Sequence, residues 1–425
     1  MRRGLWLIRI SFLLALILLC SCTPYMAGNF QLSRKNYEEA IIHYREAVSQ
    51  NPDNWKARGK LGFAYLKTGQ LEKAVNELTK VLEQEPGDPH ATLYLGLAYL
   101  NMGEVSQTIV TWKNYTNKSK PLVEEEIERQ LTLLEIAESM RLAREALAKE
   151  EELKAKDLEP GTLAVFYFKD TSAEGKYRHL QKALAMMLIT DLSQIESLQV
   201  VERLRMQFLL DEMGLGQTGL VDKETAPRAG KLLGAESLVV GTLGSGSLSV
   251  KSTIASSSRQ DVMGAFRVTS EEEEFYILEK EIVFSILKIL NVSLTPEEKE
   301  QVSKYHTKSL KAFIYFGMGL EALDQGNWKE AKNFFIKARE EDPEFLLAGA
   351  AASACPDASA PSISALSAMS AANLAGVMDG VVEAAAASQE AADTEAAAEA
   401  ETGGGGEQES TTSSETETGS VGVSW

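Results

Sequence analysis

The chain has 425 residues, with 43 Lys and Arg against 61 Asp and Glu, and its formal net charge is −18. At roughly 100–200 residues per domain, this length predicts two or three domains. The acidic balance argues against nucleic acid as a partner, because binding to a phosphate backbone needs a basic face. Three cysteines and four scattered histidines form neither a closed disulfide set nor a cluster with zinc-ligand spacing, so we expect no metal or other cofactor.

The first residues predict export and a lipid anchor. Three arginines precede an apolar run over residues 10–19, an arrangement typical of secretory signal peptides. The run is about half of the ~20 residues that a spanning helix needs, so a transmembrane anchor is the less favoured alternative. Its ending, with Leu19, Ser21 and Cys22, resembles the lipobox of bacterial lipoproteins. The resemblance implies a signal peptide over residues 1–21, a lipid on Cys22 and, since Thr23 follows instead of Asp, sorting to the outer membrane.

Residues 22–122 repeat with a period of 34. Three series recur at this spacing, a glycine, a small residue and a large residue: Gly28, Gly62 and Gly96; Ala40, Ala74 and Thr108; Tyr44, Leu78 and Trp112. Small residues at fixed points let paired helices approach closely, and large residues fill the space between them. The pattern resembles the tetratricopeptide repeat, which implies three stacked helical hairpins. A fourth copy, with Gly319, Ala331 and Phe335 at the same relative spacing, lies in a C-terminal helical segment over residues 296–347.

A long connecting helix is predicted over residues 123–160. Apolar residues recur at helical spacing up to Leu142, and Pro160 with Gly161 would end the helix. The acidic run over residues 150–152 is interpreted as a solvated face.

Residues 161–295 predict a mixed α/β domain. The expected strands and helices alternate in chain order: strand 163–168, helix 180–195, strand 198–202, helices 207–213 and 225–233, and strand 237–243. Such alternation favours a βαβ arrangement with a right-handed crossover. Two further strands over residues 248–254 and 262–268 and a final helix that includes Ile282 complete the domain.

The order of these segments resembles the CsgG family, the curli production assembly and transport component, over about 130 residues. The similarity includes residues 162–170, the helix 180–195, Glu202 with Arg203, the run 208–212 and residues 231–241. It implies a lipid-anchored, non-enzymatic domain that oligomerises or docks beside other envelope proteins. The curli channel also inserts long hairpins into the membrane. Here only residues 241–270 are available and serines interrupt their apolar face, so we expect edge strands of the domain's own sheet rather than a pore.

The sequence contains only weak candidates for a cofactor-binding or catalytic motif. Gly214, Gly216 and Gly219 fit the dinucleotide pattern, but they follow an expected helix instead of a strand, which favours a helix C-terminus and a turn. Glu202 and Arg203 follow an expected strand, and a structural ion pair is favoured over acid–base catalysis. After residue 347 the composition collapses to Ala, Ser, Glu, Gly and Thr, so residues 348–425 are expected to form a disordered acidic tail.

The repeats carry the strongest binding signal, because stacked helical pairs form a concave surface that can hold a peptide. By analogy with the family, six first-helix positions would face this groove: Lys56, Phe63, Lys67, His90, Leu97 and Asn101. A hydrophobic or mixed peptide is expected rather than a C-terminal carboxylate. The alternative is that the repeats only pack on the neighbouring domain.

The sequence therefore predicts helical-hairpin repeats, a CsgG-like α/β domain, a further C-terminal repeat and a disordered tail. The expected function is that of a non-enzymatic outer-membrane lipoprotein, facing the periplasm, that scaffolds envelope assembly or export. Its expected partners are envelope proteins or peptide segments at the repeats and the membrane at the lipid; homo-oligomers remain open. The alternatives are an oligomeric subunit of an outer-membrane secretion channel and, less favoured, a nucleotide-binding protein or enzyme of the envelope.

Overall fold

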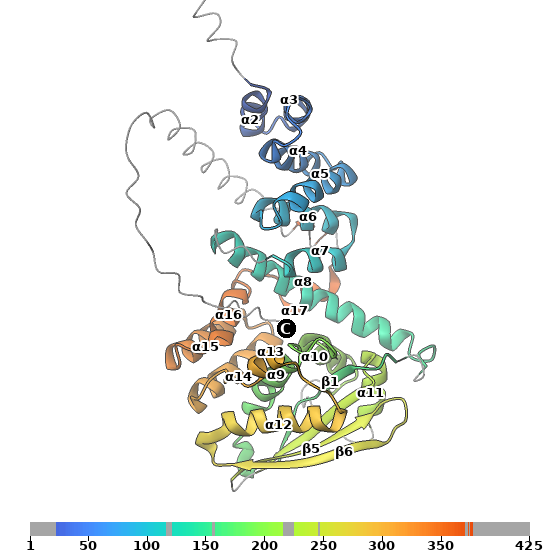
Figure 1. Cartoon of the computed structure of the whole chain (residues 1–425), viewed down its shortest axis with the longest axis vertical. Coiled ribbons are helices and arrows are strands. Elements are labelled where there is room, and N and C mark those ends of the chain that lie inside the picture. The colour runs from blue at the N-terminus through green and yellow to red at the C-terminus, as the bar shows by residue number, and fades with distance from the viewer. Residues whose placement is uncertain are drawn as a thin grey trace, which may run out of the picture. The chain divides into compact units, whose positions relative to one another are not determined.

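The computed structural model describes residues 23–115, 121–154, 158–215, 225–244, 247–369, 373 and 375–376. These residues divide into two compact units, 23–127 with 373 and 375–376, and 128–369. The expected signal peptide and Cys22 lie outside the described residues. Each unit is considered separately below, and Figure 1 labels the elements.

The first unit consists of paired helices, which confirms the predicted helical-hairpin repeats. In chain order the helices are α2 (Pro24–Ser33), α3 (Tyr37–Gln50), α4 (Trp55–Lys67), α5 (Leu71–Gln84), α6 (Pro89–Met102) and α7 (Val105–Lys113). The first helix of each pair begins at a side-chain cap, because Thr23, Asn54 and Asp88 each accept a hydrogen bond from a backbone amide three residues later. Such caps satisfy amide groups that the helix itself leaves without a partner.

The repeated glycines allow each pair of helices to approach. A Cβ atom at Gly62 would lie 2.6 Å from Cγ of Leu78, which is closer than van der Waals contact permits. The same overlap would occur between the other glycines and the large residue sixteen positions later: Gly28 with Tyr44, Gly96 with Trp112, and Gly319 with Phe335. The sequence period thus corresponds to one packing contact that each repeat makes between its two helices.

Helix α8 (Pro121–Ala148) begins in the first unit and continues into the second. It ends twelve residues before the predicted stop at residue 160. Glu150 then accepts hydrogen bonds of 2.7 and 2.8 Å from Arg228 of α11 (Ala226–Leu233). The prediction that the acidic run is only a solvated face is therefore wrong for Glu150.

The second unit contains a mixed sheet, as predicted. Among the described residues its strands are β1 (Thr162–Val165), β2 (Lys169–Asp170), β3 (Gln199–Val200), β4 (Ser237–Gly244), β5 (Leu248–Ser256) and β6 (Val262–Ser270), in the spatial order β3-β1-β4-β5-β6 with β2 beside β4. β1 pairs in parallel with β3 and β4, whereas β4, β5 and β6 are antiparallel. The hairpin of β5 and β6 thus belongs to the domain's own sheet, with β6 at the edge.

Helices cover this sheet. They are α9 (Leu180–Leu192), α10 (Arg203–Glu212), α11 and α12 (Phe275–Leu290), with short 3₁₀ turns η2 (Ala173–Gly175) and η3 (Glu272–Glu274). α12 packs on β5 and β6, and a Cβ at Gly264 of β6 would overlap Ile289 of α12. In Figure 1, α12 runs across these two strands.

The C-terminal helices complete the second unit. They are α13 (Pro296–Val302), α14 (Leu310–Asp324), α15 (Trp328–Glu341), α16 (Leu346–Ala354) and α17 (Ile363–Ala368). α13 begins with a capping box, in which Thr295 and Glu298 each accept a hydrogen bond from the other's backbone amide. α14 packs on α9, with Gly317 against the backbone of His179.

The expectation of disorder from residue 348 onwards is wrong for residues 348–369. Ala348 and Ala351 of α16 are fully buried, and the α16 helix packs on α15. Cys355 is also buried, its thiol donates to the Trp328 carbonyl at 3.4 Å, and burial raises its pKa to about 12. An alanine-rich segment has the composition of a low-complexity tail, yet alanine favours helices and packs closely against a neighbouring helix.

Candidate functional site

The predicted groove residues occupy the first helices of two successive repeats. Lys56, Phe63 and Lys67 lie on α4, and His90, Leu97 and Asn101 occupy the corresponding positions of α6. Their spacing of seven and four residues places each set on one helix face.

These six side chains differ in exposure. Lys56 and Asn101 are exposed, and Lys67 is half-buried. Phe63, His90 and Leu97 are 5%, 4% and 1% exposed. The expectation that all six present themselves to a ligand is therefore wrong for the buried three, and the groove assignment stays a prediction for the others.

The position of Phe63 has a direct cause in the repeat stack. Its ring centroid lies 4.7 Å from that of Tyr94 on α6 and 6.2 Å from that of Tyr37 at the start of α3. Aromatic rings at such separations attract one another beyond simple area burial. Phe63 thus joins consecutive repeats instead of serving as an open contact.

Charge is distributed unequally between the two kinds of helix. α4 carries Lys56, Arg58, Lys60 and Lys67, while α2, α4 and α6 contain no Asp or Glu. Among the second helices, α3 and α5 carry six glutamates against three cations, and α7 carries one lysine and no acid: Glu38, Glu39, Glu46, Glu72, Glu77 and Glu83, with Arg45, Lys73, Lys80 and Lys113. Arg58 donates to Glu77 at 2.6 Å, which ties α4 to α5. The first-helix face is therefore the more basic one.

The second unit contains a buried polar cluster beyond the carboxyl ends of β1 and β3. Arg203, at the start of α10, is 0% exposed and donates to both carboxylate oxygens of Asp324 on α14, at 2.8 and 2.9 Å. It also donates to the Tyr167 hydroxyl at 3.2 Å, and Lys182 of α9 donates to the same Asp324 carboxylate. Ligands of open α/β sheets usually bind at this end of the strands, but here an aspartate of the C-terminal repeat occupies it.

The electrostatics of this cluster explain its arrangement. Burial alone would disfavour a charged guanidinium, but the adjacent Asp324 carboxylate outweighs that cost and raises the pKa of Arg203. The preference for a structural ion pair at Arg203 is thus supported, although its partner lies 121 positions along the chain.

A second buried cluster connects α9, α12 and the segment before α14. The Lys280 ammonium lies 2.5 Å from Asp191 and 3.1 Å from Glu279, and His306 Nε2 lies 2.8 Å from the other Asp191 oxygen. Burial and the neighbouring Asp191 raise the pKa of Glu279 well above its usual range. Burial opposes ionisation of Asp191, but its bonds with His306 and Lys280 prevail and lower its pKa.

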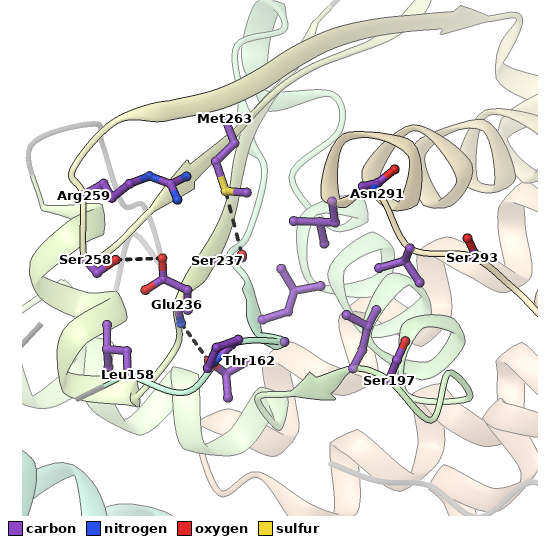
Figure 2. Close-up of a pocket in the computed structure, with 16 residues that line it drawn as sticks. Leu158, Thr162, Ser197, Glu236, Ser237, Ser258, Arg259, Met263, Asn291 and Ser293 are labelled. Atoms are coloured by element: carbon purple, nitrogen blue, oxygen red, sulfur yellow. Dashed lines mark hydrogen bonds between the residues drawn. The ribbon is translucent and has the colours of Figure 1, made fainter. Parts of the chain in front are cut away.

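A cavity of about 740 Å³ lies at the opposite end of the sheet, beside the amino ends of β1 and β4 (Figure 2). Its size falls in the range of small-molecule sites, about 300–1,000 Å³. Glu236 is its principal acid, and it accepts from Ser258 at 2.8 Å, while its own amide donates to Thr162 at 2.8 Å. Its carboxylate is thus engaged by hydroxyl groups of the β5–β6 turn, and we assign it no reaction.

The glycine-rich segment follows α10, as the turn interpretation requires. Gly214 has a φ of +76° directly after the helix end, the conformation of a helix C-terminus. Gly216 and Gly219 lie outside the described residues. Within the described ranges, no group of three or more His, Cys, Asp and Glu side chains could hold a metal ion. In the part of the chain that the structure covers, no helix has both the length and the apolar character needed to cross a membrane.

Comparison with known proteins identifies two segments. Residues 148–257 match the family described as the curli production assembly/transport component CsgG, and residues 31–91 match a tetratricopeptide repeat family. The chain therefore contains tetratricopeptide repeats and a CsgG domain. No curated protein matches the chain.

Several solved structures show weak overall similarity. Yeast Tom70 has a TM-score of 0.24 and 16% identity, with 76% of this chain and 62% of Tom70 covered. A tetratricopeptide repeat protein from Parabacteroides merdae has a TM-score of 0.24 and 14% identity, with 77% and 95% covered. The P58(IPK) tetratricopeptide domain has a TM-score of 0.26 and 17% identity, with 76% and 75% covered. The chain thus spans less than two thirds of Tom70, and similarity at this level implies nothing about function.

Proposed function

We propose that the chain is a non-enzymatic scaffold lipoprotein of the outer membrane, held by a lipid on Cys22 and facing the periplasm. Its repeats bind other envelope proteins or peptide segments during curli-type envelope assembly or export. The observation that carries this proposal is the presence of stacked helical hairpins and a CsgG domain in one chain.

The arrangement of buried charges supports a structural role for them. Asp324 joins the C-terminal repeat to α9 and α10, and Asp191 joins α9 to α12 and to His306. Groups held in this way are already engaged with partners in the fold. A catalytic acid or base would instead need to reach a substrate.

The position of the hairpin supports a scaffold over a channel subunit. β5 pairs along its length with β4 and β6, and α12 packs against both hairpin strands. A hairpin that entered a membrane from this fold would first have to leave the sheet and its helix.

Envelope crosslinking followed by affinity capture of the full chain tests the proposal. We expect captured partners to be lost in a Lys56→Glu, Lys67→Glu double variant, because these side chains lie on the first-helix face. Arg45→Glu is the control for a charge reversal elsewhere in the repeats, since Arg45 is exposed on the second helix α3, and this variant should retain the captured partners. Loss of envelope association in Cys22→Ala would support the lipid anchor. Equal loss in both charge variants, or capture of nothing by the wild type, would contradict the scaffold.

A further inference from the structure

One row of residues crosses the sheet of the second unit from β2 to β6. The pairing registers join Lys169 to Thr242, Thr242 to Lys251, and Lys251 to Arg267. Residues paired in register project from the same face of a sheet. Three of the four are cationic, and all three are exposed.

This face is opposite to the one that α12 covers. Gly264, which meets Ile289 of α12, lies three residues from Arg267 on β6, so their side chains point to opposite faces. On the cationic face, α11 covers the first part of β4, where Leu238 meets Gly230, and β4 is buried up to Val240. Thr242, four residues further along β4, is only half-buried, so the row is open to solvent at this point.

Lys251 and Arg267 are direct neighbours across the antiparallel strands. Like charges in this position repel each other and destabilise the pair. No described residue forms an ion pair or side-chain hydrogen bond with Lys169, Lys251 or Arg267. The first acid after Arg267 in the chain is Glu271, directly after the end of β6 and roughly 13 Å from Arg267 at the usual rise of a strand. Within the described residues this row is therefore an exposed cationic strip without a bonded acid, and an acidic segment from outside these residues is complementary to it.

The C-terminal segment of the same chain has the required charge. Residues 377–425 contain eleven Asp and Glu and no Lys or Arg. Eight of the acids form pairs separated by one residue: Asp393 and Glu395, Glu399 and Glu401, Glu407 and Glu409, Glu415 and Glu417. In an extended chain the two side chains of such a pair point to the same side, and their Cα atoms are about 6.6–7 Å apart. Lys251 and Arg267 lie on adjacent strands, about 5 Å apart, and Lys169 lies two strands from Lys251, about 10 Å away.

We propose that the acidic segment 377–425 docks on the Lys169–Lys251–Arg267 row and covers this sheet face within the same molecule. Its 49 residues give a reach of about 40 Å even as a random coil, and the covalent link gives the contact a high effective concentration. The interaction is electrostatic, between exposed groups, and therefore weakens in salt. Any outside partner of this sheet face must displace the segment first.

Carbodiimide crosslinking of the purified full chain tests this proposal, because it joins lysine amines to carboxylates that touch them. We expect mass spectrometry to find Lys169 and Lys251 joined to Glu or Asp of residues 377–425 in the monomeric species. These crosslinks should fall severalfold in Arg267→Glu and in about 0.5 M salt. Arg267→Glu leaves both lysines in place and replaces the repulsive neighbour of Lys251 by an attractive one, so the fold should be retained.

Arg178→Glu is the control, because Arg178 is exposed in the same unit outside the row and the variant has the same net charge. Crosslinks from the segment to Lys56 or Lys67 of the repeats, or between two copies of the chain, would overturn the proposal. So would the absence of crosslinks in a chain that sediments with anionic vesicles, because the row would then face lipid. An equal loss of crosslinks in both arginine variants would contradict a role for the row.

Discussion

Glycine at one position of each helical pair determines how closely its two helices approach. On α4, Gly62 meets Leu78 at a distance that excludes a Cβ, whereas Gly59, three residues earlier, has no atom within 4 Å of the same position. The two glycines share a helix but differ in their surroundings, which makes them a matched pair.

We expect Gly62→Ala to lower the free energy of unfolding by about 1–3 kcal/mol, because the added methyl must push Leu78 away. Gly59→Ala should raise it by up to about 1 kcal/mol, because alanine favours a helix interior over glycine. Urea unfolding of the full chain, followed by helical circular dichroism, measures both. The same sign for the two substitutions would show that Gly62 is not a packing contact.

A single carboxylate, that of Asp324, balances one buried and one half-buried cation in the second unit. Asp324→Asn should lower the free energy of unfolding by about 3–5 kcal/mol, because Arg203 and Lys182 would lose their counter-charge in a buried place. Glu341→Gln is the control, since its ion pair with Lys311 is largely exposed and should contribute less than about 1 kcal/mol. Denaturant unfolding compares them; effects of equal size would argue against the importance of the buried cluster.

At the scale of elements, two carboxylates where α9 meets α12 make the stability of the protein depend on pH in opposite directions. Glu279 has a raised pKa in the folded protein, so the folded state holds its proton more tightly than the unfolded chain. Its contribution to stability is therefore present below the unfolded pKa, about 4.3, and is lost as pH rises through the folded pKa. Asp191 has a lowered pKa, and its contribution is lost as pH falls through that value.

Glu279→Gln should therefore stabilise the protein near neutral pH and make stability decline less as pH rises above about 4.3. Asp191→Asn should have the opposite effect near neutral pH, because Lys280 and His306 would lose their anionic partner. Melting temperatures of both variants and the wild type, measured from about pH 4, near the usual carboxyl pKa, to about pH 8, test the pair. A steeper decline with rising pH in Glu279→Gln would contradict the assignment.

The sequence predicts elements best where the determining contact is local. Gly62 and Leu78 are sixteen residues apart in one hairpin, so a fixed period is enough to identify their packing. Arg203 and Asp324 are far apart in sequence, and no spacing rule can pair them. α16 escaped prediction for another reason: its alanines look like low complexity, and only the packing against α15 distinguishes a buried helix from a tail.

The predicted groove residues also show that a sequence period does not reveal contacts between different repeats. The period correctly places Phe63 and Leu97 on the first helices, but it cannot tell an exposed position from one that an aromatic neighbour covers. Tyr37 and Tyr94, which enclose Phe63, belong to two other helices. Their contribution becomes visible only once the repeats are stacked.

At the scale of the whole molecule, the formal charge of −18 conceals separate regions of opposite sign. Helix α4 of the repeats and one sheet row are basic, while α3, α5 and residues 377–425 carry a net negative charge. Such separation favours docking of charged segments and partners, and contacts of this kind give specificity and rate of association more than affinity.

The size and subunit composition of the complex extracted from envelopes in mild detergent test the scaffold most directly. The proposal predicts a heteromer in which the wild-type chain accompanies a different envelope protein, and which the Lys56→Glu, Lys67→Glu double variant fails to form. A high-order, ring-shaped assembly of this chain alone would contradict it and would instead indicate a subunit of a secretion channel.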